Sequence, residues 1–127
     1  MLINCTNHPY SIWSDKQKNA AKEYGEVTDL PFPAVLPRYD GADLRRLTEE
    51  YSEKIIEMKP DAVMVAGEFT LAFMLVDKLL QEGIKVICTC STRQTTEVKL
   101  PDGSNEKKAV FVFERFREYE YYRGKTE

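Results

Sequence analysis

Three short apolar runs, each preceded or followed by a helical pattern, limit the folds open to this chain more than any other feature. Residues 62–66 are fully apolar, without the alternation of a half-exposed strand, and residues 2–6 and 84–90 are mainly apolar strand candidates. Such runs are typical of strands buried on both faces of a parallel sheet. Helical patterns at residues 15–24, 40–59 and 69–80 separate them, and residues 26–30 form another strand candidate. This order predicts an α/β fold with a doubly wound, mainly parallel sheet and helices on both faces.

Local signals place the helix ends. Ser14 stands three residues before Gln17 in a capping-box pattern, and Asp40 precedes the second helical pattern. Residues 69–80 are apolar nearly all round, which predicts a third helix that is deeply packed.

The pattern changes after residues 91–93. Residues 94–100 and 107–117 read as two strands joined by a turn at 101–104, so we expect a C-terminal β-hairpin. Alternation puts five side chains on one face of the last strand: Phe111, Phe113, Arg115, Arg117 and Tyr119. We expect one domain over residues 1–119 and a polar tail over residues 120–127.

Composition narrows the function classes. The chain has 127 residues and a net charge of −3, which argues against binding to long nucleic acids. It has no apolar run of the roughly 18 residues needed to span a bilayer. Residues 1–5 lack the basic region and the cleavage site of a signal peptide. The chain has three cysteines, and this odd number does not indicate a framework of disulfide bonds. These features predict a cytoplasmic protein without a membrane partner.

The predicted sheet gathers polar residues at one edge. In such sheets, ligands bind beyond the carboxyl ends of the strands, where the winding direction reverses. The loops there would be formed by Asn7 and His8 after the first strand, by residues 67–70 after the third, and by residues 91–93 after the fourth.

Two residues between the apolar runs of 62–66 and 69–80 are candidates for binding. Gly67 would let a ligand approach the backbone, and the amides of residues 68–70 would attract anions at a helix start. Glu68 suits a ribose hydroxyl, an exocyclic amine or a base role, and the alternative is that it only complements the helix dipole. His8 is the single histidine, a residue type suited to moving protons, and the alternative is a surface or loop-capping role.

A further group would complete the edge. Arg93 can form a bidentate pair with a phosphate, and Ser91 and Thr92 can add hydroxyl donors. The alternative for Arg93 is a surface ion pair. Trp13 would stack a base or cover the core, and core cover is the expected role. Cys5, His8, Cys88 and Cys90 lack a strong zinc spacing, so we expect neither a metal nor a cofactor.

Several motifs follow one another in order: residues 67–70, residues 88–93, Glu97 with the turn at 101–103, and residues 111–119, with His8 and Gln17 upstream. This set resembles the small single-domain CRISPR-associated proteins of type III systems. Those proteins have a Rossmann-like fold related to the sensor domains that bind cyclic oligoadenylate. The resemblance covers most of the chain, and residues 26–60 carry little of it.

The resemblance implies a homodimer that binds cyclic tetra-adenylate or a similar ring and cuts it without a metal, as a ring nuclease that ends the antiviral signal. It implies that His8, Glu68 and Arg93 are catalytic. It also implies a binding set consisting of Asn7, His8, Trp13, Gly67, Glu68, Phe69, Thr70, Ser91, Thr92 and Arg93.

This chain departs from the proteins that it resembles at two positions. Phe113 stands where relatives carry a histidine, and Glu68 where they often carry aspartate. The alternatives are therefore a non-catalytic sponge that holds the same ring, and an unrelated small nucleotide-binding or protein-interaction domain.

Overall fold

Five strands form one sheet in the order β2-β1-β3-β4-β5 in the computed structural model, which describes residues 1–125. The strands are β1 (Leu2–Cys5), β2 (Val27–Asp29), β3 (Ala62–Val65), β4 (Val86–Lys99) and β5 (Asn105–Glu118). All neighbouring pairs are parallel except β4 and β5, which are antiparallel. The predicted α/β fold with a mainly parallel sheet and a C-terminal hairpin is confirmed.

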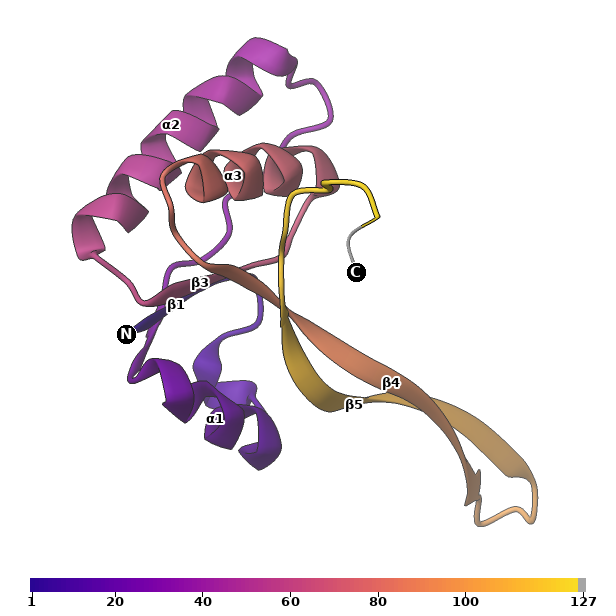
Figure 1. Cartoon of the computed structure of the whole chain (residues 1–127). Coiled ribbons are helices and arrows are strands. Elements are labelled where there is room, and N and C mark those ends of the chain that lie inside the picture. Colours follow the sequence, from indigo (N-terminus) through magenta and orange to yellow (C-terminus); the bar gives the residue numbers. More distant parts are fainter. Residues whose placement is uncertain (126–127) are drawn as a thin grey trace.

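Helices cover both faces of the sheet (Figure 1). On one face lies α1 (Asp15–Ala21), continued by the 3-10 turn η2 (Lys22–Tyr24) and preceded by η1 (Tyr10–Ile12). On the other face lie α2 (Gly41–Met58) and α3 (Phe69–Gln81). None of the helices in residues 1–125 is long and apolar enough to cross a membrane.

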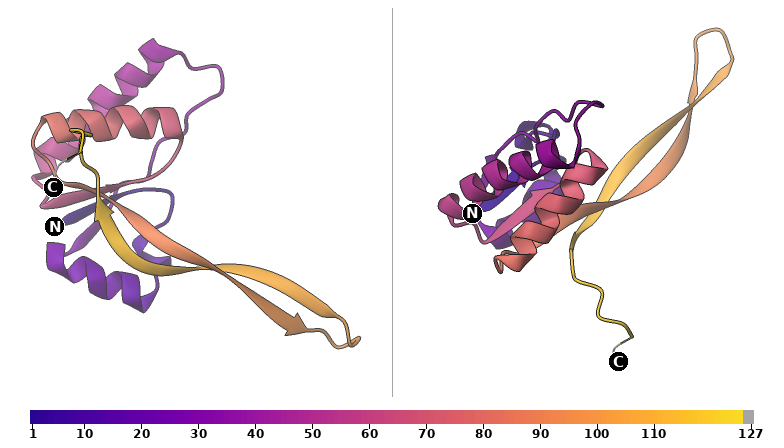
Figure 2. Two further views of the ribbon diagram at one scale, coloured as in Figure 1. Left: turned by 45° about the vertical axis from the view of Figure 1, so that its right-hand side comes forward. Right: turned by 90° about the horizontal axis from the view of Figure 1, so that it is seen from above.

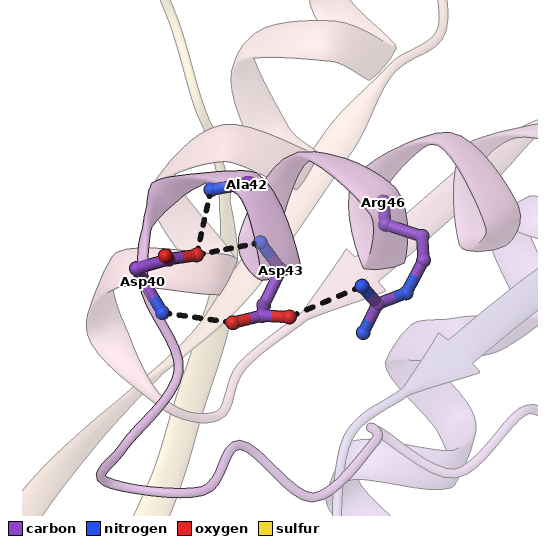
Figure 3. Close-up of polar contacts among 4 residues, drawn as sticks. All are labelled: Asp40, Ala42, Asp43 and Arg46. Carbon is purple, nitrogen blue, oxygen red and sulfur yellow. Dashed lines mark hydrogen bonds and ion pairs between the residues drawn. The ribbon is translucent and has the colours of Figure 1, made fainter.

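The predicted helix starts are confirmed by their caps. Ser14 Oγ accepts a hydrogen bond from Gln17 N at 3.2 Å. At the start of α2, Asp40 Oδ1 accepts from the amides of Ala42 and Asp43, and the Asp43 carboxylate accepts from Asp40 N at 3.0 Å (Figure 3). These side chains satisfy amides that a helix start leaves without partners.

Two apolar cores lie on opposite sides of the sheet. Between the sheet and the pair α2 and α3, the core residues of the strands include Ile3, Val63 and Val65. Against α1 and its flanking turns, the core residues include Trp13 and Met64. Alternate strand residues therefore serve different cores, which explains why the strands are apolar on both faces.

The β4–β5 hairpin is much longer than predicted and projects from the body as an arm (Figure 2). β4 pairs with β3 only at Val86 and Ile87, and from Cys88 onward its one ladder partner among residues 1–125 is β5. The prediction that strand four ends at Cys90, with residues 91–93 in a loop, is wrong: Ser91, Thr92 and Arg93 lie inside β4.

A β-bulge at the root of the arm changes which side chains share a face. Thr89 pairs with Phe116 and Ser91 pairs with Phe113, so β5 carries one extra residue between these pairs. Phe113 and Phe116 therefore point to the α1 side, with ring centroids 4.9 Å apart. The prediction that Phe111, Phe113, Arg115, Arg117 and Tyr119 share one face is wrong for Arg115 and Arg117, because alternation restarts after the bulge, and Tyr119 lies just beyond the end of β5.

The deep packing predicted for the third helix is confirmed on only one side. Leu71, Leu75 and Leu79 are buried, but Phe69 and Phe73 are 89% and 76% exposed.

The predicted tail also has some contact with the body. Residues 120–125 form no helix or strand, the Tyr121 hydroxyl donates to the Asp77 carbonyl at 3.3 Å, and residues 126–127 lie outside the described residues. The division at residue 119 stays a prediction.

Candidate functional site

A cavity of about 940 Å³ lies at the root of the arm, on the α1 side of the sheet. Its walls come from the loop after β1, the start of α1, the end of β3 and both strands of the arm. The apolar wall is formed by Ile12, Trp13, Met64, Ala66, Phe111, Val112 and Phe113. The polar groups include Thr6, Asn7, His8, Lys16, Gln17, Thr89 and Ser91. A mostly apolar cavity with a few convergent polar groups is the usual form of a small-molecule site.

The structure brings together half of the predicted binding residues. Asn7, His8, Trp13, Gly67 and Ser91 line the cavity. The remaining predicted residues, Glu68, Phe69, Thr70, Thr92 and Arg93, are outside its lining.

The loop that carries His8 is held by a buried polar network. Asn4 Nδ2 donates to the His8 carbonyl and to Asp29 Oδ1, each at 2.8 Å. Thr6 Oγ1 donates to Asn4 Oδ1 at 2.7 Å and accepts from the His8 amide at 3.0 Å. Asn4 is only 1% exposed. Side chains from two strands therefore fix the backbone at His8, and this backbone places His8 at the cavity.

Trp13 packs in the core, as expected. Its indole N–H donates to the His8 carbonyl at 2.9 Å, and the side chain is 5% exposed. Its ring lies 6.3 Å from that of Phe116. The indole therefore supports the cavity wall and the His8 loop, and its buried position leaves little ring face for a stacked base.

Glu68 is the N-cap of α3. Its carboxylate accepts from Thr70 N and Leu71 N, both at 2.9 Å, and from the Thr70 hydroxyl at 2.7 and 2.6 Å. The Thr70 hydroxyl, followed by the two amides, lowers the pKa of Glu68 below its ordinary value. A carboxylate whose oxygens are engaged in this way is a weak proton acceptor, so the geometry favours the helix-start alternative.

This capping makes the contribution of Glu68 to stability depend on pH. A lowered folded-state pKa gives stabilisation that is full above the unfolded value of about 4.3 and is lost as pH falls through the folded pKa. We expect Glu68→Gln to lower the Tm at pH 7 and the gap to wild type to close in acid. Thermal unfolding across a pH series measures the gap. Glu57→Gln, at an exposed position on α2, is the control, and a gap that persists in acid would contradict the assignment.

The space beside Gly67 is occupied by protein. A Cβ at this position would lie 2.3 to 2.5 Å from three ring atoms of Phe32, which is 5% exposed. The missing side chain of Gly67 makes room for Phe32, in the proline-rich loop of residues 31–37, and Phe32 is part of the core against α2 and α3. The expectation that a ligand approaches the backbone at Gly67 stays a prediction.

Arg93 lies just beyond the cavity on the arm. It pairs with Phe111 across the ladder, and it shares a strand face with Ser91, two residues earlier. Its side chain is exposed. Thr92 points to the opposite face of the ribbon, where its hydroxyl donates to Glu114 Oε1 at 3.1 Å. Of the residues expected in a loop here, Ser91 and Arg93 are thus the pair directed to the cavity side.

Sequence reasoning missed Asn4, Thr6 and Asp29 as supports of the site, and Phe111 and Phe113 as its wall. Asn4 gave a signal, because it is an amide inside an apolar strand.

The cysteines lie elsewhere. Cys5 is buried in the core on the side of α2 and α3, and this burial raises the pKa of its thiol to about 12. Within the described residues, no group of three or more His, Cys, Asp or Glu side chains is placed to hold a metal ion.

Fold and cavity together define a small α/β protein with a ligand-sized cavity at the carboxyl edge of its sheet and an arm beside it. The chain belongs to the family described as the Uncharacterized protein MJ1673 family, whose model matches residues 1–117. No curated protein matches the chain.

Proposed function

We propose that this protein is a cytoplasmic, Rossmann-like protein that binds cyclic oligoadenylate, most specifically cyclic tetra-adenylate, and cuts it as a metal-independent ring nuclease in type III CRISPR signalling. The observation that carries the proposal is the cavity at the root of the arm, where the only histidine, hydroxyl groups and aromatic walls meet. The resemblance of the ordered motifs supplies the ligand class. The two-fold symmetry of such a ring supports a homodimer with one cavity for each half.

The cavity offers groups for each part of a nucleotide. Phe111 is 73% exposed at its mouth and provides a face on which adenine can stack. Arg93, next to Phe111 on the ladder, provides charge for a phosphate. Lys16 is a cation of the lining itself, and its Nζ lies 3.9 Å from Glu114 Oε2.

The proposed cut needs alignment and proton movement. The ribose 2′-oxygen attacks the neighbouring phosphorus, the bond from phosphorus to the 5′-oxygen breaks, and the products end in a 2′,3′-cyclic phosphate and a 5′-hydroxyl. His8 accepts the proton of the 2′-hydroxyl, and the leaving 5′-oxygen takes a proton from water or from the protonated imidazole. Arg93 offsets the charge that develops on the phosphate. Since the Glu68 carboxylate caps α3, its part in this scheme is to fix the helix start.

One observation favours the sponge as a second candidate. Phe113, which stands where relatives carry a histidine, is 6% exposed and forms part of the cavity wall. The phenyl group of Phe113 cannot transfer a proton. His8 is therefore the only imidazole that a cyclic nucleotide could meet within one subunit.

Single-turnover incubation with labelled cyclic tri-, tetra- and hexa-adenylate in EDTA tests the proposal. We expect linear products ending in cyclic phosphate, a loss of about 100-fold or more in cleavage rate for His8→Ala with binding retained, and weaker binding for Arg93→Ala. Arg45→Ala, an exposed arginine on α2, is the matched control and should behave as wild type.

The other outcomes separate the candidates. Tight binding with an intact ring would identify a sponge. If no ring binds, the proposal fails and the third alternative, an unrelated nucleotide-binding or protein-interaction domain, remains.

A further inference from the structure

Gln17 differs from the other buried polar residues in residues 1–125, because its side chain has no hydrogen-bond partner there. It lies on the inner face of α1 and is 8% exposed. The other four buried polar residues all use their side chains in hydrogen bonds, and they are Asn4, Thr6, Thr48 and Ser52. Buried polar groups of folded proteins are nearly always hydrogen-bonded, so an exception indicates a role other than holding the fold.

The local partner of this carboxamide is not used. In a capping box, the side chain three residues after the N-cap accepts a hydrogen bond from the N-cap amide. Asp43 does so at the start of α2, where its carboxylate accepts from Asp40 N at 3.0 Å. At the start of α1, Ser14 Oγ accepts from Gln17 N, but within the described residues the Gln17 side chain makes no return bond to Ser14. Only half of this capping box is therefore formed, and the carboxamide is available for another contact.

The carboxamide of Gln17 faces the cavity at the root of the arm. Within residues 1–125, every side-chain nitrogen or oxygen that is fully buried has a hydrogen-bond partner, so a carboxamide without one must reach open space. Gln17 is nearly buried and is part of the cavity lining, so that space is the cavity. α1 packs against β5, which brings the rings of Phe111 and Phe113 to the same cavity. A polar group placed in a mainly apolar cavity is the usual means of orienting a ligand.

We propose that Gln17 reads the base of the bound nucleotide. Its Oε1 accepts a hydrogen bond from the 6-amino group of one adenine, and its Nε2 donates to the ring nitrogen beside that amino group. A carboxamide holds one acceptor and one pair of donors in a single plane, and the edge of adenine offers the complementary donor and acceptor. The inference rests on the proposed function and deepens it, because it assigns the preference for adenine to one side chain.

The same geometry predicts how strongly the base is selected. A base without the 6-amino group leaves Oε1 of Gln17 desolvated and without a donor, and a site built to hydrogen-bond its ligand rejects an analogue for this reason. A bidentate contact between a carboxamide and adenine discriminates by roughly 10-fold to 100-fold. Both groups are neutral, so this preference should not change with pH, whereas proton transfer by His8 should.

Calorimetric titration with two matched ligands tests the inference. Cyclic tetra-adenylate is compared with the cyclic tetranucleotide of purine riboside, whose bases lack only the 6-amino group. All proteins carry His8→Ala, which keeps the ligands intact. We expect this protein to bind the adenine ligand at least about 10-fold more tightly, and the further change Gln17→Met to make the two affinities equal. Gln81→Met, at an exposed position on α3, is the matched control and should keep the preference.

Thermal unfolding shows whether Gln17 also serves the fold. Because its carboxamide has no partner among the described residues, we expect Gln17→Met to leave the Tm unchanged or to raise it. Methionine has a similar length and no strong hydrogen-bonding group, so the variant should fold. A lower Tm together with an unchanged preference for adenine would assign Gln17 to the fold and overturn the inference.

The outcomes separate this inference from the proposed function. If cyclic tetra-adenylate binds but Gln17→Met keeps the preference, or if the two ligands bind equally well from the start, the inference fails and the proposed function stands. If no cyclic oligoadenylate binds, the proposed function fails, and the 5′-monophosphates of adenosine and purine riboside replace the cyclic ligands. A preference for adenosine monophosphate that Gln17→Met removes would then support the inference alone, and its absence would overturn both.

Discussion

Gly67→Ala should destabilise the protein by about 3 kcal/mol and lower its Tm by about 10 °C, although it adds only one methyl group. The added Cβ would overlap three atoms of the Phe32 ring, including Cγ at 2.5 Å. Because Cγ lies on the Cβ–Cγ axis, rotation of the ring about that axis does not remove the overlap. Phe32 is itself buried, so either its loop or the start of α3 must move.

Urea unfolding of four variants, Gly67→Ala, Gly41→Ala, Phe32→Ala and the double variant of Gly67 and Phe32, checks this expectation. Gly41→Ala is the matched control, because its Cβ would meet only the end of the flexible Arg45 side chain, at 3.1 Å. It should be neutral or stabilising by up to about 1 kcal/mol, since alanine favours a helix over glycine. Phe32→Ala removes the obstructing ring, so the double variant should lose about 2 kcal/mol less than the two single losses together. A loss below about 0.5 kcal/mol for Gly67→Ala would show that the ring does not pack there.

Local signals predicted most of the secondary structure, because the side chains that cap the start of a helix are its neighbours in the sequence. Ser14 and Asp40 cap the helices that their patterns indicated. The alternation of strands and helices also predicted that the loops of His8 and Gly67 meet, and both residues line one cavity. Ser91 lines it too, but from inside β4 and not from the expected loop. The prediction for the two loops worked because the edge at which parallel strands end follows from their order alone.

The arm was outside the reach of the same reasoning. Side-chain patterns reveal a strand only when one of its faces is buried, and most of the arm is exposed on both faces. Its hydrogen bonds join main-chain groups, so the run of Ser91, Thr92 and Arg93 looked like a loop. A helix that is apolar all round has a related ambiguity. Its pattern does not show which apolar side chains are buried, and in α3 Phe69 and Phe73 are exposed.

Side-chain contacts over long sequence distances explain the remaining misses at the site. Phe32 fills the space beside Gly67 from a loop 35 residues away, and nothing near Gly67 in the sequence indicates it. The capping role of Glu68 was one of two readings that its position allowed, and only the hydrogen bonds to Thr70 and Leu71 separate them.

Asn4→Ala should cost about 3 kcal/mol and should also release the loop that carries His8. The side chain of Asn4 makes three hydrogen bonds at once, to the His8 carbonyl, the Asp29 carboxylate and the Thr6 hydroxyl. Its removal breaks these three hydrogen bonds at a site where Asn4 itself is buried, and each is worth about 1 kcal/mol. The His8 carbonyl keeps the Trp13 indole as a donor, and the Asp29 carboxylate keeps the Tyr10 amide. Thermal and urea unfolding measure the stability, and the NMR signals of the His8 ring report the loop.

Asn4→Asp separates the hydrogen bonds from the volume of the side chain. It has nearly the same shape, but it replaces the donating amide with an oxygen that faces two acceptors, the His8 carbonyl and the Asp29 carboxylate. At neutral pH it should therefore be at least as destabilising as alanine. Asn19→Ala, at an exposed position on α1, should stay within about 0.5 kcal/mol of wild type. If Asn4→Asp proved harmless, the amide would not be the group that holds the loop, and the fixed position of His8 would need another cause.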